Sequence, residues 1–186
     1  MRVKATMLRT RLDFLAERFG APGVDTVLGA LGEEEARTLH SVLPSSWLPF
    51  SLLNRLDDVI VRKLGGGHTE LIREAGAFSA RRNLTSIYKV FVDQAQGDPL
   101  RLMESLSGMH ATFYDWGGMK IHAIDGRSCR METDYLGGAA RTNCLSAIGF
   151  YSEALRQLQL KSVRVEEQQC QVTGAPLCVY EVSWER

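Results

Sequence analysis

The segment EEQQCQVTGAPLC, residues 166–178, places two of the four cysteines of this 186-residue chain on opposite sides of one short turn. Cys170 and Cys178 are each four residues from Gly174, so a hairpin that turns symmetrically about this glycine sets them directly opposite one another. Cross-strand partners on one face of a hairpin have Cβ atoms about 4.5 to 5.5 Å apart. Both sulfur atoms can therefore reach one zinc ion at roughly 2.3 Å each.

A third cysteine lies on the apolar face of a helix predicted over residues 142–160. Apolar residues recur there at steps of four and three, which is the period of one buried helix face. This face consists of Cys144, Ile148, Tyr151, Leu155 and Leu158. Because it has to pack against the sheet, Cys144 is expected to approach the hairpin cysteines.

Glu167 is the fourth candidate ligand of the same ion. A regular strand sends residues three apart to opposite faces, so Glu167 and Cys170 can meet only if the strand bends or bulges near residues 168–169. On spacing alone two other readings stay open. The cysteines can be core thiols that bind nothing, since free cysteine is among the most buried residue types, or Cys170 and Cys178 can form a disulfide.

Composition limits the class of protein. With 45% hydrophobic and 24% charged residues, the chain fits one well-filled domain or one domain with a helical extension. Lys and Arg together equal Asp and Glu at 22 each, which gives no electrostatic footprint for nucleic acid or a membrane surface. The first twenty residues alternate charged and apolar residues at helical spacing, unlike a signal peptide or a membrane span. We expect a cytoplasmic protein with reduced thiols.

Residues 1–97 are expected to form an N-terminal helical region. Leu8, Leu12, Leu15 and Phe19 draw one apolar stripe along a helix that ends at Gly20. Further amphipathic runs follow at the same period. The pair DP at residues 98–99 is an N-cap followed by proline at the first helical position, so another helix begins there.

Residues 98–186 are expected to form a ligand-binding type of α+β core. After the helix, the period changes from that of a helix to that of strands at residue 117, and the Asp-Gly pair at 125–126 is typical of a hairpin. Two more strands follow the helix over residues 142–160. The predicted fold is α+β, with helices on one face of a small antiparallel sheet, and the two regions form one compact unit.

The four candidate ligands carry a family resemblance. Cys144, Glu167, Cys170 and Cys178, with Gly174 in the last loop and VYEV after it, resemble the C-terminal part of the 4-vinyl reductase family of small-ligand-binding domains. This family includes the sensor domains of phenol-responsive transcription activators, in which such a set holds zinc. The resemblance covers about residues 100–186 and implies a fold related to haem nitric-oxide-binding domains. The helical first part looks similar to a myxobacterial paralogous family of unassigned function.

The resemblance implies zinc as a structural cofactor. A closed site with three thiolates and one carboxylate has no position for a water molecule, so the ion would hold the hairpin to the helix rather than perform catalysis. We therefore expect no catalytic residue.

The resemblance also implies a ligand cavity between helices and sheet. The segment GMHATFYDWGGMKIH, residues 108–122, is rich in aromatic residues, and their walls with a polar tip suit an aromatic or flat apolar ligand. The same residues are equally typical of a filled core. The candidate pocket residues are His110, Phe113, Tyr114, Trp116, His122 and Tyr151.

Haem binding in the related fold requires a proximal histidine and a Tyr-x-Ser-x-Arg motif, and this motif does not occur in the sequence. We therefore predict a non-enzymatic, zinc-stapled sensor of small ligands or a protein-interaction module. The phenol sensors signal to an attached ATPase domain, which the sequence does not contain, so we expect a separate protein partner and a homodimer formed through the N-terminal helices. The alternatives are a reductase-like enzyme, although no nucleotide-binding fingerprint occurs, and a haem or tetrapyrrole carrier.

Overall fold

Up to residue 113 the chain is mostly helical, with two short strands, and after it the chain forms the main sheet and one further helix. The computed structural model of the protein describes residues 1–86 and 88–185. Its helices are α1 (Ala5–Leu31), α2 (Glu33–Ser41), α3 (Phe50–Lys63), α4 (Glu70–Leu84), α5 (Lys89–Ala95), α6 (Pro99–Gly108), α7 (His110–Phe113) and α8 (Arg141–Arg156). Its strands are β1 (Arg2–Lys4), β2 (Trp47–Pro49), β3 (Gly118–Asp125), β4 (Ser128–Asp134), β5 (Ser162–Gln169) and β6 (Cys178–Glu185).

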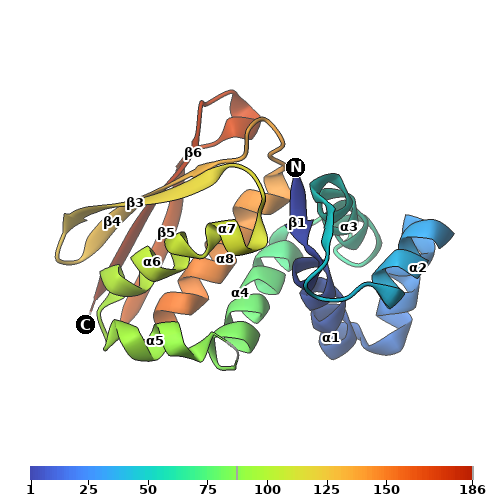
Figure 1. Ribbon diagram of the computed structural model, residues 1–186, viewed down its shortest axis with the longest axis horizontal. Coiled ribbons are helices and arrows are strands. Elements are labelled where there is room, and N and C mark those ends of the chain that lie inside the picture. Colours follow the sequence, from blue (N-terminus) through green and yellow to red (C-terminus); the bar gives the residue numbers. More distant parts are fainter. Residues whose placement is uncertain (87, 186) are drawn as a thin grey trace.

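The main sheet has the order β3-β4-β6-β5, and each neighbouring pair is antiparallel. Figure 1 shows α4, α6 and α8 along one face of this sheet, which confirms the predicted α+β arrangement. Alternate residues of the two central strands point toward these helices and are buried. They include Cys129, Met131, Tyr180, Val182 and Trp184.

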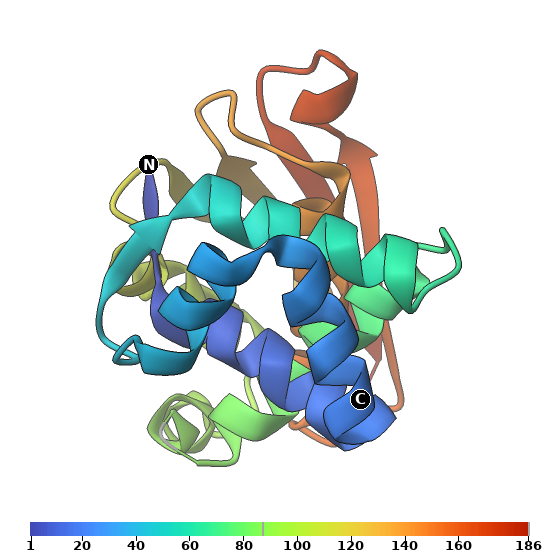
Figure 2. The ribbon, with the colours of Figure 1, turned by 90° about the vertical axis from the view of Figure 1, so that its right-hand side faces the viewer.

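The helices α1, α2 and α3 lie together at one end of the molecule, and the main sheet lies toward the other end (Figures 1 and 2). The sequence predicted a helix end at Gly20, and the backbone does leave the helical region there, with φ 68° and ψ −172°. Helix α1 nevertheless resumes beyond this kink and continues to Leu31. The two short strands β1 and β2 pair antiparallel beside these helices, and their three-residue length explains why no strand period was visible in the sequence.

A buried ion pair connects α1 to α3 and α8. The Arg11 Nε atom lies 2.8 Å from Asp57 Oδ1, and the two side chains are only 2% and 0% exposed. Arg11 Nη2 also donates a hydrogen bond of 2.6 Å to Ser146 Oγ on α8. Removing one member of such a pair leaves a buried, uncompensated charge and costs about 3 to 5 kcal/mol.

Helices α4 and α8 approach one another closely at two glycines. A Cβ atom at Gly76 would overlap the carbonyl oxygen of Ser146, and one at Gly149 would overlap the carbonyl oxygen of Arg73. The helix backbones are therefore in direct contact. Helix α4 belongs to the predicted N-terminal region and α8 to the predicted core, and the two helices pack directly against one another. The predicted boundary at residues 97–98 therefore stays a prediction. Among the described residues, none of the helices is both long and apolar enough to cross a membrane.

This contact yields a stability prediction. Gly149→Ala should lower the free energy of unfolding by about 1 to 3 kcal/mol, because the added methyl group forces the two backbones apart. Gly29→Ala is the matched control, since it lies in α1 with no atom within 4 Å of the added Cβ. It should stabilise the helix by about 0.5 to 1 kcal/mol. Urea unfolding of both variants measures the difference, and equal effects would contradict the close contact.

Candidate functional site

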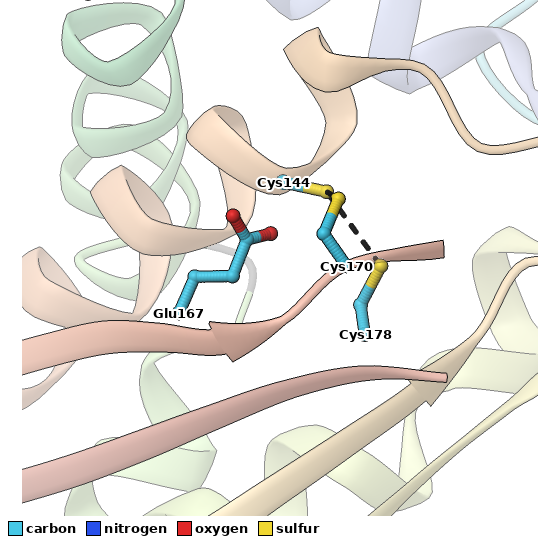
Figure 3. A group of neighbouring side chains, drawn as sticks. All are labelled: Cys144, Glu167, Cys170 and Cys178. Carbon is cyan, nitrogen blue, oxygen red and sulfur yellow. Dashed lines mark hydrogen bonds between the residues drawn. The ribbon is translucent and has the colours of Figure 1, made fainter. Parts of the chain in front are cut away.

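The side chains of Cys144, Glu167, Cys170 and Cys178 converge at one end of the sheet. One ligand atom from each residue lies within 4.8 Å of those of the other three. Cys144 Sγ lies 3.5 Å from Cys170 Sγ and 3.7 Å from Cys178 Sγ, and the three thiols are free and buried. Figure 3 shows the three sulfur atoms together, with the Glu167 carboxyl group close to them.

Each residue reaches the cluster from a different element. Cys144 lies in the first turn of α8, Cys178 begins β6, and Cys170 directly follows β5. The strand register shifts between Glu167 and Gln169, which is the irregularity that the sequence required of this strand. Gly174, with a φ of 95°, turns the chain back toward β6.

The Glu167 carboxyl group is incompletely satisfied. Its Oε2 atom accepts a hydrogen bond from Arg141, whereas its buried Oε1 atom has no hydrogen-bond partner among the described residues. The hydroxyl of Tyr180 is likewise buried without a partner in the part of the chain that the structure describes. Buried polar atoms are normally hydrogen-bonded, so these two atoms are exceptions beside the thiol cluster.

The thiols influence one another. The hydrogen bond with Cys144, followed by that from the backbone N–H of Gln171, lowers the pKa of Cys178 against the opposing effect of burial. The same Cys144–Cys178 hydrogen bond and burial raise the pKa of Cys144. Three sulfur atoms and a carboxylate oxygen without a donor are a donor set that suits a thiophilic metal ion.

A cavity of about 120 Å³ lies among α1, α4, α6, α7, β3 and α8. Of the predicted pocket residues, His110, Phe113, Tyr114 and Tyr151 line it. The sequence reasoning missed Arg11 and Tyr135, which also line it. No local pattern marks them, because each reaches the cavity through packing of elements far apart in the chain.

Trp116 and His122 lie outside the set of residues that line this cavity. The Trp116 ring packs against Phe50, with centroids 4.6 Å apart, and its Nε1–H donates to the carbonyl oxygen of Arg2. His122 has a side chain that is 52% exposed and lies 3.3 Å from Glu132. It follows an inward-facing residue of β3, and successive strand residues face opposite sides, so His122 is directed away from the helices.

Burial favours the neutral forms of His110 and Tyr114 at the cavity. Burial lowers the pKa of His110, and the hydrogen bond of 3.1 Å between its Nε2 and the Trp116 carbonyl oxygen opposes this only in part. The neutral ring therefore carries its proton on Nε2. Burial also raises the pKa of Tyr114 to about 12.

Comparison with solved structures identifies the fold of the chain, whereas comparison of its sequence identifies no relative. No protein-family model and no curated protein sequence matches the chain. A solved structure of an H-NOX protein from S. oneidensis in the Fe(II)NO ligation state matches with a TM-score of 0.76 and 15% identity, over 98% of this chain and 99% of that chain. This chain has the H-NOX fold. An oxygen-binding H-NOX domain related to soluble guanylate cyclases matches with a TM-score of 0.75 and 14% identity, over 98% and 95% of the two chains.

The prediction of zinc as the cofactor is wrong for this fold. A further solved structure with a TM-score of 0.72, 15% identity and coverage of 98% and 99% concerns haem redox potential and porphyrin distortion. The cofactor that these H-NOX structures carry is thus haem iron, and the four-residue cluster by itself does not establish a zinc ion.

The residues of this chain do not fit haem. Its cavity of about 120 Å³ is smaller than the roughly 300 Å³ at which pockets for drug-sized ligands begin. The Nε2 atom of His110, the one histidine that lines it, is hydrogen-bonded to a carbonyl oxygen. Arg11, a candidate for binding a propionate, is paired with Asp57 instead. The Tyr-x-Ser-x-Arg motif is missing from the sequence as well.

The pKa of Tyr114 yields a test of the cavity's burial. An unfolded tyrosine has a pKa of about 10, so the folded chain retains this proton more strongly and its contribution to stability is lost as the pH rises from about 10 to 12. Up to pH 11, Tyr114→Phe should remove about 1 to 1.5 kcal/mol of this loss, which is about half of the full effect of two pKa units. Urea unfolding of both proteins from about pH 9 to 11 measures it, and parallel pH profiles would show that the hydroxyl is solvated.

Proposed function

We propose that this chain is a non-enzymatic sensor domain that binds a small ligand in the cavity beside α8. The observation that supports the proposal most directly is a cavity with buried polar walls in the interior of the H-NOX fold. The S. oneidensis protein is described with bound NO and the guanylate cyclase-related domain as an oxygen complex. We transfer only the general role, binding of a small molecule inside the fold, and not the haem.

The polar walls support ligand binding over a purely structural core. Burying polar groups in an apolar interior costs stability unless they are satisfied. Here the cavity brings together the hydroxyl groups of Tyr114 and Tyr135, the His110 ring and the Arg11–Asp57 ion pair. An apolar core of the same shape would avoid this cost. Polar side chains at this cavity are therefore better explained by contacts with a bound ligand.

The proposal assigns no catalytic residue. The titratable groups at the cavity are a histidine whose pKa burial lowers, an arginine that is already paired with Asp57, and tyrosines whose pKa values burial raises. They do not form a free acid and base pair of the kind that general acid–base catalysis needs. No observation favours the reductase-like enzyme, and the poor fit of the cavity to haem argues against a haem carrier.

We further propose that Cys144, Glu167, Cys170 and Cys178 form a metal-binding site where α8 meets the β5–β6 hairpin. The three neighbouring sulfur atoms and the unpartnered Glu167 Oε1 atom support this role. The same four residues support kinship with the 4-vinyl reductase family as a finer hypothesis within the H-NOX fold.

Signalling requires that ligand binding alter the position or contacts of another part of the molecule. Met7 and Arg11 of α1 line the cavity, so a ligand would contact the N-terminal helices directly. We propose that these helices pass the signal to a separate protein partner, and that they also form a homodimer. Light scattering of the purified chain tests the dimer, which a monomeric mass would exclude.

Ligand binding in the cavity can be tested by filling it. Single-ring compounds should raise the melting temperature, because a ligand at a hundred times its Kd stabilises the folded state by about 2.7 kcal/mol. Ala147→Leu, at the cavity wall, should abolish this shift. Ala30→Leu, at an exposed position of α1, should leave it unchanged. Retention of the full shift in Ala147→Leu would place the ligand elsewhere.

The metal proposal has its own test. Cys178→Ser should lose the bound metal ion, as measured by elemental analysis for all metals, and should lower the melting temperature by several degrees. Cys129→Ser is the matched control, because Cys129 is a buried free thiol outside the cluster. It should keep the metal content of the wild-type chain. Wild-type protein purified without chelator and free of any metal would contradict the proposal.

A further inference from the structure

The size of the cavity limits its ligand to a single ring. Its volume of about 120 Å³ is close to that of an engineered apolar cavity of about 150 Å³ that binds benzene. The rings of Phe113 and Phe150 are among its walls and provide apolar surface for such a ring.

The charges around the cavity select against an ionised ligand. Among the described residues that line it, Arg11 is the one side chain that is charged at neutral pH, apart from any minor charged fraction of His110. Its charge is compensated by Asp57, at 2.8 Å, with both groups almost fully buried. Burying a further charge without a partner is strongly unfavourable. A carboxylate or an ammonium group would find no free counter-charge at this wall.

Most polar side chains of the cavity already have partners. Asn143 accepts from the Ala140 N–H at 2.7 Å and donates to Asn54 at 2.9 Å. The hydroxyl of Tyr151 donates to the sulfur of Met119 at 3.2 Å. These groups therefore contribute little that is free for a ligand.

Two phenol hydroxyls differ from this pattern. Tyr114 and Tyr135 line the cavity, and no hydrogen bond of either hydroxyl to another described residue is found. Neither hydroxyl is among the fully buried polar atoms that lack a partner, so both stay accessible to a molecule in the cavity. Burial raises the pKa of both, so both stay protonated and act as donors at neutral pH. Each hydroxyl is therefore free to donate to an acceptor atom of a ligand, which adds about 0.5 to 1.5 kcal/mol for a typical hydrogen bond.

From size, charge and free donors together we propose that the cavity prefers an uncharged single-ring compound that carries a carbonyl oxygen, with Tyr114 and Tyr135 as the hydrogen-bond donors that recognise it. This inference rests on the proposed function and specifies its ligand class. The ring lies against the apolar walls, and the carbonyl oxygen accepts hydrogen bonds from the two hydroxyl groups.

The test compares three compounds of similar size on the purified 186-residue chain by titration calorimetry. Acetophenone has an uncharged acceptor, ethylbenzene has none, and benzoate has a charged one. Acetophenone should bind about tenfold more tightly than ethylbenzene, which corresponds to one hydrogen bond of about 1.4 kcal/mol. Benzoate should bind at least tenfold more weakly than acetophenone.

Substitutions then assign the donors. In Tyr114→Phe and Tyr135→Phe the preference for acetophenone over ethylbenzene should fall several-fold, while the affinity for ethylbenzene stays the same. Tyr151→Phe is the matched control in the same cavity and should keep the preference, because the Tyr151 hydroxyl already donates to Met119.

The outcomes separate this inference from the function on which it rests. Equal affinities for acetophenone and ethylbenzene would overturn the assigned ligand class while leaving a small-ligand cavity. Tightest binding of benzoate would overturn the charge argument and with it the inference. Absence of binding by all three compounds would overturn the proposed function itself.

Discussion

The buried ion pair between Arg11 and Asp57 is the interaction on which the arrangement of this molecule depends. It joins α1 to α3, and through Ser146 it joins both to α8. The pair lies where the N-terminal helices meet the core, so it determines how the cavity between them is closed. Because its two charges compensate one another, this wall of the cavity is polar yet carries no net charge.

The regular elements of the C-terminal part could be predicted because their signals are local. The Asp-Gly turn marks the first hairpin, and the spacing of Cys170 and Cys178 about Gly174 marks the second. The register shift beside Glu167 was expected only if Glu167 and Cys170 face the same site, because residues three apart in a regular strand face opposite sides. The alternation of residues along β3 also indicates that His122 points away from the helices, whereas its neighbours in the strand point toward them. This signal was not used when His122 was placed in the pocket.

The cavity could not be predicted in the same way. Arg11 and Asp57 are 46 residues apart, and nothing near either position in the sequence indicates the other. Tyr135 follows β4 and reaches the cavity only because α8 returns over the sheet. The cofactor could not be predicted from the fold signals in the sequence either, because one fold supports different chemistry according to the side chains of its site. H-NOX structures with iron share the backbone arrangement of this chain, whereas its cavity residues are unsuited to haem.

Helix α8 ties the cluster to the cavity. Cys144 faces the hairpin from the first turn of α8, while Asn143 and Ala147, within one turn of it, line the cavity. Any cation held by Cys144 would restrain this turn and so the cavity wall, and a ligand that ordered the wall would in turn favour the cluster. Such coupling between two sites is reciprocal by thermodynamic necessity. Helix α8 is thus the element that contacts both the thiol cluster and the cavity.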